Sequence, residues 1–280
     1  VADGRLDWSG GGVSDTASSG IYAVGGAVAL TDLEFARLNG FGVYADVATV
    51  EMSGIRVEEA LAAGIRVVEC QSDLRDLRID ATVYDEGGLN TGNGLDLVSG
   101  EATVVGIETH GAALTGIRAT NAARATIEGA VVHDAGVDGL SVQAESVVTV
   151  DGAEIRDTGS TGVVVIDAQL TLRDAQVIGH RRQGMLSGRD GRLIGERVLV
   201  EDGETRGISV LAGTAAFQDL TVRRSADVAL SVSDASEPVT VEGGIFEDNA
   251  STGVAVTGRE PVSLVGVTVR GTRRGPDGLA

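Results

Sequence analysis

A glycine followed by an aliphatic residue recurs along this chain at nearly constant spacing. Most steps are 22 to 25 residues long, and only the step from Gly64 to Gly94 is longer, at 30. The series is Gly20, Gly42, Gly64, Gly94, Gly116, Gly139, Gly162, Gly184, Gly207, Gly253 and Gly278, with Ala229 between Gly207 and Gly253. A fixed period of this length is typical of a repeat protein in which each unit packs on its neighbours.

A second column in the same register consists almost entirely of residues that tolerate a positive φ. Its members are Asp32, Gly54, Asp76, Gly106, Gly129, Gly152, Asp174, Glu196, Asp219, Gly243 and Gly266. Gly and Asp adopt positive φ at low cost, so the column predicts a bend in every repeat, with Glu196 its weakest member. Residues two before the bend are all apolar, and residues three after it are apolar except Thr109. This alternation predicts a β-strand on each side of the bend.

The Gly-aliphatic segment supplies a third short strand in each repeat. Three short strands per repeat of 22–23 residues predict an all-β fold, a right-handed single-stranded parallel β-helix of about eleven coils. The hand follows from the strong preference for right-handed parallel crossovers. Aromatic residues make up only 3% of the chain, so we expect a core of Val, Ile, Leu and Ala. A leucine-rich-repeat horseshoe would require the recurrent L-x-x-L-x-L-x-x-N signature, which this chain lacks.

Repeats such as VTVDGAEIRDTGSTGVVV and PVTVEGGIFEDNASTGVAV resemble those of the pectate-lyase-like superfamily of right-handed parallel β-helices. The resemblance covers the chain from about Gly20 to its C-terminus. It implies the fold, whereas the superfamily's activities range over lyases, hydrolases, epimerases, phage spikes and non-catalytic surface proteins.

We expect two regions. Residues 1–19 form an N-terminal cap or irregular first coil, with Trp8 over the core, and residues 20–280 form the β-helix, with an insertion at about 80–93. The array is expected to be a segment of a longer protein. Its ends are expected to pack against flanking domains or another chain, because a solenoid must cap or pair its open edges.

The chain carries a net charge of −19, and all 22 of its basic residues are Arg. Such an acidic surface argues against nucleic acid and anionic membranes as partners. No apolar run approaches the roughly 18–20 residues that span a bilayer, so we expect no membrane insertion. The single cysteine, Cys70, is expected to be buried and inert.

Four residues after the bend, successive repeats place Asp80, His110 and His133 in one outward column, with Glu108 alongside. Neighbours in such a column lie roughly 5 Å apart. Imidazoles and carboxylates at this spacing can perform acid–base chemistry, and His110 and His133 are candidate ligands for Ca²⁺ or another divalent metal. The alternative is a solvated ladder of mixed charges that requires no cofactor. The third histidine, His180, is expected in a surface loop.

Further candidate binding residues lie in the insertion and in the first coils. The insertion contains Tyr84, Asp85, Glu86 and Asn90. We expect these residues to be candidates for ligand binding, because loops that leave a rigid scaffold often bind ligands. Tyr22 and Tyr44 are expected in equivalent outward positions of adjacent coils. There they either stack on a glycan or form an ordinary cross-strand pair.

The resemblance also implies motifs that can be tested. We find no compact Asp cluster of the pectate-lyase kind, and the NTD, DD, GHG and RIK motifs of polygalacturonases and the DPHD motif of alginate epimerases are absent. The sequence therefore favours a non-catalytic extracellular or cell-surface β-helix that serves as a rigid spacer or as a platform binding a glycan or another protein. The alternative is a polysaccharide lyase or glycoside hydrolase using Asp80, Glu108, His110 and His133.

Overall fold

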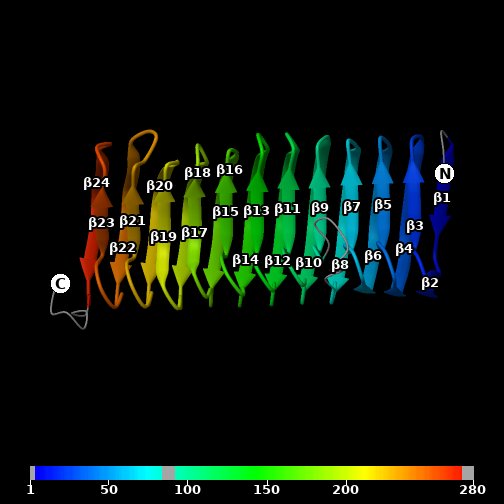
Figure 1. Cartoon of the computed structure of the whole chain (residues 1–280), viewed down its shortest axis with the longest axis horizontal. Coiled ribbons are helices and arrows are strands. Elements are labelled where there is room, and N and C mark those ends of the chain that lie inside the picture. Colours follow the sequence, from blue (N-terminus) through cyan, green and yellow to red (C-terminus); the bar gives the residue numbers. More distant parts are fainter. Residues whose placement is uncertain (1–3, 84–91, 273–280) are drawn as a thin grey trace.

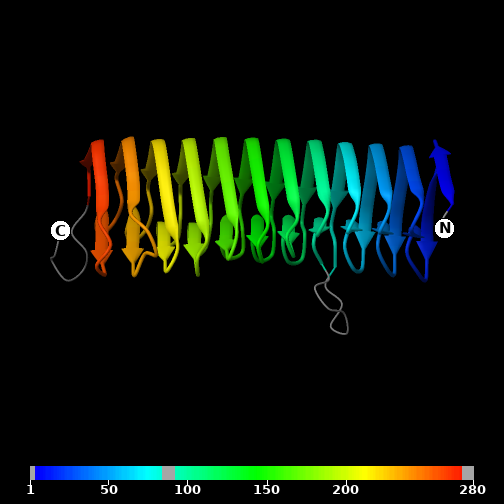
Figure 2. The same cartoon turned by 90° about the horizontal axis from the view of Figure 1, so that it is seen from above.

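The computed structural model describes residues 4–83 and 92–272, and within these ranges every regular element is a β-strand. The strands wind into a rod of stacked coils whose N-terminal (blue) and C-terminal (red) ends lie far apart (Figure 1). Seen from above, the coils lie side by side along the rod (Figure 2). The predicted single-stranded parallel β-helix of about eleven coils is confirmed. The described part of the chain contains no helix that could cross a membrane.

The strands form two parallel sheets that run the length of the rod. The long-strand sheet contains β1 (Arg5–Ser9), β2 (Gly12–Thr16), β4 (Ala27–Leu38), β6 (Thr49–Ala60), β8 (Gln71–Asp80), β10 (Glu101–His110), β12 (Arg124–His133), β14 (Val147–Arg156), β16 (Gln169–Ile178), β18 (Arg192–Glu201), β20 (Thr214–Arg223), β22 (Val239–Glu247) and β24 (Val262–Arg270). The short-strand sheet contains β3 (Ile21–Val24), β5 (Val43–Asp46), β7 (Ile65–Val68), β9 (Leu95–Val98), β11 (Ile117–Thr120), β13 (Leu140–Gln143), β15 (Val163–Ile166), β17 (Gln183–Gly188), β19 (Arg206–Leu211), β21 (Leu230–Ser233) and β23 (Val254–Thr257).

Each strand pairs with the equivalent strand of the coils before and after it, so side chains of one repeat position stack along the rod. Val150, for example, pairs with Ile127 on one side and Leu172 on the other, and all three are buried. The first coil keeps this register, since β1 and β2 both pair with β4 and place Leu6 on Val28 and Val13 on Phe35.

Each coil turns at residues with positive φ. The predicted bend divides each long strand into two segments, so a coil has three strand segments although only two sheets are formed. Two further columns of positive-φ residues were not predicted. One follows the short strands, as at Val47 and Asp167, and the other ends the long strands, as at Asp134, Asp157 and Asp248.

One member of the predicted bend column is wrong. Arg197 has a φ of 52° and pairs in register with the bend residue Asp174, so the bend lies one residue after Glu196. The Arg197 guanidinium donates to both Asp174 carboxylate oxygens at 2.6 and 2.7 Å, a bidentate bond that helps to hold the backbone there. The shift turns Gly195 inward, where the Phe217 ring fills the space that a side chain would need.

The prediction that His180 lies in a surface loop is also wrong. Its side chain is fully buried inside a corner of the coil, and its Nε2 lies 3.1 Å from the carbonyl oxygen of Arg206. The imidazole occupies the space above Gly203 in the next coil, where a Cβ would come within 2.0 Å of Nε2. A large residue in one coil is therefore accommodated by a glycine in the next.

This size complementarity predicts that Gly203→Ala destabilises the fold. Overpacking a filled interior typically costs about 1–3 kcal/mol, and we expect a loss of that size in the free energy of unfolding in urea. Combining it with His180→Ala should cost less than the sum of the two single changes, because the ring that the new methyl group meets is gone. Gly188→Ala is the control, since its nearest neighbouring atom lies at 3.6 Å. Additive effects would show that the two residues do not share this space.

Acid should destabilise the fold through His180. Burial lowers the pKa of His180 from 6.5 to about 4, so between these values the unfolded chain binds a proton that the folded protein does not. The free energy of unfolding should therefore fall by up to about 3 kcal/mol as the pH drops through this window. We expect His180→Gln to lose less stability than the parent between pH 7 and 4.5 in urea titrations. Equal losses in both proteins would contradict this assignment.

Candidate functional site

The predicted ladder lies on the outward surface of the long-strand sheet after the bend, which we call the post-bend face. One column runs Glu34, Arg56, Arg78, Glu108, Val131 and Glu154, and the other runs Ala36, Glu58, Asp80, His110, His133 and Arg156. His110 pairs in register with Asp80 on one side and His133 on the other. The predicted stacking of these residues is confirmed, whereas their chemical role stays a prediction.

Ion pairs link the two columns. The Arg78 guanidinium lies 2.9 Å from an Asp80 oxygen and 3.2 Å from a Glu108 oxygen. Arg56 lies 2.5 Å from Glu58 and 3.8 Å from Asp80. The carboxylates predicted as acid–base candidates are thus joined to arginines, with Glu108 about half-exposed and Asp80 largely buried.

Both histidines of the ladder lie beside carboxylates. His110 Nε2 is 2.9 Å from Asp134, and His133 Nε2 is 3.4 Å from Glu154. Glu154 also pairs with Arg156, and this hydrogen bond is the largest cause that holds the pKa of Glu154 below its usual value. His110 is 54% exposed, so the His110–Asp134 pair is largely hydrated. Such a pair can orient an imidazole.

The predicted metal site requires several ligands that converge on one point. Within residues 4–83 and 92–272, no group of three or more His, Cys, Asp and Glu side chains is arranged to hold a metal ion. Of the two candidates, His110 faces Asp134 and His133 faces Glu154, so each imidazole has its own carboxylate. The arrangement is that of two separate pairs.

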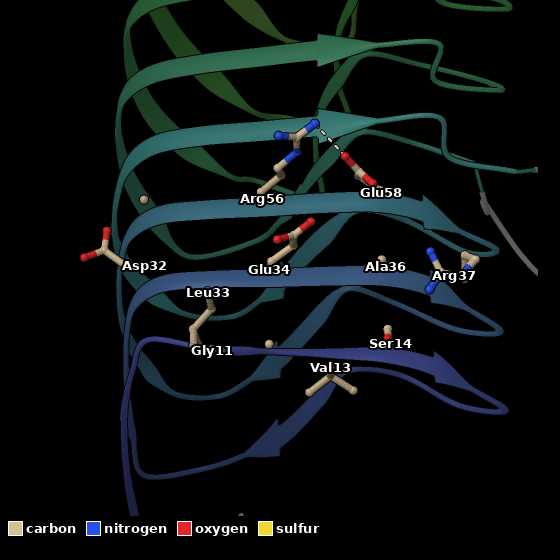
Figure 3. A pocket seen from close by; sticks show the side chains of 12 residues that line it. Gly11, Val13, Ser14, Asp32, Leu33, Glu34, Ala36, Arg37, Arg56 and Glu58 are labelled. Atoms are coloured by element: carbon tan, nitrogen blue, oxygen red, sulfur yellow. Dashed lines mark ion pairs between the residues drawn. The ribbon is translucent and has the colours of Figure 1, made fainter.

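The same face opens into a hollow of about 710 Å³ at its N-terminal end, between β2, β4 and β6 (Figure 3). We call it the N-terminal hollow. It exists because the two charged columns end in small residues. Gly12 precedes Glu34 in one column, and Ser14 and Ala36 precede Glu58 in the other. A Cβ on Gly12 would come within 2.2 Å of the Glu34 carbonyl oxygen, so this position excludes a side chain. This hollow was not predicted from the sequence, because no motif marks it.

The walls of the N-terminal hollow are charged. Arg37 forms two bonds to Asp15, at 2.6 and 2.7 Å, and Arg56 pairs with Glu58. In Figure 3, Glu34 lies next to Arg56, and Asp32 lies at the bend of β4 and points away from the other labelled side chains. Among the described residues, neither the Asp32 nor the Glu34 carboxylate forms a hydrogen bond or an ion pair. Both arginines are therefore ion-paired, while the two carboxylates that line the hollow at Asp32 and Glu34 are not, within the described part of the chain.

Tyr22 and Tyr44 lie on the other sheet, in adjacent coils as predicted. Their rings stack with centroids 4.6 Å apart and planes 7° from parallel, and Phe41 contacts Tyr44 at 5.1 Å. Tyr44 is thus covered on two sides, while Tyr22 keeps 59% of its surface exposed. Only Tyr22 retains the accessible surface that stacking on a sugar ring would require.

The column that begins with this tyrosine pair continues through Arg66, Asp96 and Arg118. Asp96 is fully buried although it lies on the outward side of β9. Arg118 donates to both Asp96 oxygens at 2.8 and 3.0 Å, and Arg66 approaches at 3.4 Å. Sequence analysis missed this group, although Arg, Asp and Arg occupy one repeat position in three successive coils. The candidates Tyr84, Asp85, Glu86 and Asn90 lie outside the described residues.

Comparison with known protein families shows to which family the rod belongs. Residues 20–197 match the family described as the right handed beta helix region. A search of curated proteins finds no match.

Solved structures share the fold at low sequence identity. The periplasmic alginate epimerase AlgG aligns over 87% of this chain and 77% of its own, at 10% identity and a TM-score of 0.64. The A-module of the Azotobacter vinelandii mannuronan C-5 epimerase AlgE4 aligns over 88% and 89%, at 14% identity and a TM-score of 0.54. The Dettilon tailspike protein aligns over 85% and 55%, at 13% identity and a TM-score of 0.53. These identities establish similarity of fold alone.

Because Asp96 is buried and Glu108 is exposed, we expect removal of the Asp96 carboxylate to cost far more stability than removal of the Glu108 carboxylate. Asp96→Ala leaves two arginines without their carboxylate, and removal of one partner from a buried pair costs about 3–5 kcal/mol. Glu108→Ala removes an exposed partner, for which we expect less than about 1 kcal/mol. Urea unfolding of the two variants at neutral pH measures both values. Similar losses would show that Asp96 is not an essential part of the packing.

Proposed function

This chain belongs to the right-handed β-helix family, and we propose that it is a non-catalytic member that binds a glycan on its post-bend face and serves as a rigid platform. The N-terminal hollow carries the proposal, because it is concave, polar and built on a sheet. Its volume of about 710 Å³ falls within the roughly 300–1,000 Å³ typical of small-ligand sites. A site on paired strands also holds its groups more rigidly than a loop does.

The ion-paired side chains of the post-bend face are better suited to binding than to catalysis. An enzyme stabilises its transition state with groups preorganised in a water-excluded site. Here Arg78 bridges Asp80 and Glu108, and His110 is half-exposed on an open sheet face. The hollow lies near Arg56 and Glu58, whereas the histidines lie in later coils. The histidines are therefore separated from the N-terminal hollow along the rod, whereas Asp80 borders it through Arg56 and Glu58.

The structural neighbours support a glycan as the ligand class. Two of them are epimerases of alginate and of mannuronan, which are polysaccharides. One is periplasmic and another is a tailspike protein, which supports a place outside the cell or at its surface. The alternative, a polysaccharide lyase or hydrolase, rests on the His110–Asp134 pair, which could orient an imidazole as a base.

We expect the purified chain to bind at least one polysaccharide or oligosaccharide and to leave it intact. Binding is measured on a glycan array and by calorimetry. Turnover is followed by release of reducing ends and of unsaturated products, with protein at stoichiometric concentration and with or without Ca²⁺. Because no step is assigned to the histidines, His110→Ala and His133→Ala should bind like the parent.

Two results would contradict this proposal. Failure to bind any glycan would remove the ligand class. Depolymerisation that is abolished by His133→Ala would establish the enzyme alternative.

A further inference from the structure

Unpaired carboxylates outnumber unpaired cations among the described side chains of the N-terminal hollow. Of its charged side chains, Arg37 is held by Asp15 and Arg56 by Glu58. The Asp32 and Glu34 carboxylates are the members that no ion pair or hydrogen bond engages among the described residues. A ligand that supplies donors would therefore meet two carboxylates that no cation of the described chain neutralises.

We infer that the N-terminal hollow selects an uncharged saccharide over an acidic one. This inference rests on the proposed function and adds the substrate class and the residues that choose it. Sugar hydroxyls donate hydrogen bonds to carboxylates, and such charge-assisted bonds are stronger than neutral ones. An acidic sugar would instead bring a carboxylate toward Asp32 and Glu34, where like charges repel.

Arginines that recognise acidic sugars do so with a free guanidinium fork. The Arg37 fork spans both oxygens of Asp15, so recognition of a second carboxylate would first require that bond to break. Arg56 is ion-paired through one nitrogen, since its Nη2 lies 2.5 Å from Glu58 and 3.8 Å from Asp80. Each arginine thus has a carboxylate of its own, whereas Asp32 and Glu34 have no cation among the residues that the structure describes.

The field of the whole chain works in the same direction. A net charge of −19 repels polyanions at a distance and leaves neutral sugars unaffected. An acidic polysaccharide would meet this repulsion before it reached the hollow.

The floor of the hollow leaves room for a sugar ring beside the acceptors. Ser14 and Ala36 occupy the second charged column at the N-terminal end of the rod. Both side chains are small, since Ser has one heavy atom beyond Cβ and Ala has none. Figure 3 shows these two residues beside Glu34. Bulk introduced at Ser14, which is exposed on β2, would fill this space without disturbing the core.

Calorimetry with matched oligosaccharides tests the inference. Uncharged hexasaccharides of glucose, mannose and xylose are compared with oligogalacturonate and oligomannuronate of similar length, using residues 1–280. We expect binding of at least one uncharged oligomer and at least tenfold weaker binding of the acidic ones. Glu34→Gln should weaken the uncharged ligand about fivefold or more, and Ser14→Leu should weaken it further.

Glu128→Gln is the matched control, because it makes the same change in net charge at an exposed position of β12 outside the hollow. It should leave affinity within twofold of the parent. Circular dichroism confirms that each variant retains its β-structure.

Tighter binding of the acidic oligomers would overturn the inference and leave the proposed function standing. So would glycan binding that is unchanged in both Glu34→Gln and Ser14→Leu, since the site would then lie elsewhere. If no glycan of either kind binds, the proposed function fails as well. Equal weakening by Glu128→Gln would attribute the effect to net charge and would also overturn the assignment to the hollow.

Discussion

Each coil of this rod must turn three corners, and its corners depend on residues in the left-handed region of backbone conformation. For a residue with a side chain this conformation costs about 1–2 kcal/mol, so a corner repeated in every coil would accumulate strain. Asp and Gly lower that cost and fill many of the corners. At three of the corners that Arg occupies, Arg37, Arg197 and Arg224, the guanidinium donates to both oxygens of the Asp in the preceding coil. The bonds between coils therefore support the conformation within each coil.

The same stacking determines what the outer surface looks like. Residues of one repeat position lie roughly 4.8 Å apart along the rod, so like charges in a column repel and mixed charges pair. Columns of Arg, Asp and Glu are thus an expected product of the fold. The pairs Arg78–Glu108 and Glu201–Arg223 illustrate this at two distant places on the post-bend face. A place where small residues interrupt the columns is not an expected product of the fold. The N-terminal hollow is such a place, and it is therefore the stronger candidate for a binding site.

The fold was predictable because the inward-facing positions of a solenoid recur in the sequence at a fixed period. The bend column, the apolar columns and the stacking of His110 on His133 all follow from that period. The errors arose where an interaction between coils replaced a local preference. Arg197 occupies a corner because Asp174 binds it, and His180 is buried because Gly203 provides its space. The hollow was missed for a related reason, since it is formed by side chains that are absent and no motif records an absence.

A repeat fold of this kind separates architecture from recognition. The inward columns need only be apolar and of suitable volume, so two chains can share the rod while agreeing at about one position in ten. Recognition then rests on the outward positions, which the fold leaves free to vary. Similarity of fold to alginate and mannuronan epimerases therefore does not determine what this surface binds, and the charges of the surface must be considered separately. In the proposed site, as far as the chain is described, both arginines are ion-paired while Asp32 and Glu34 are not, so an uncharged sugar is expected to find acceptors where a polyanion is expected to be repelled.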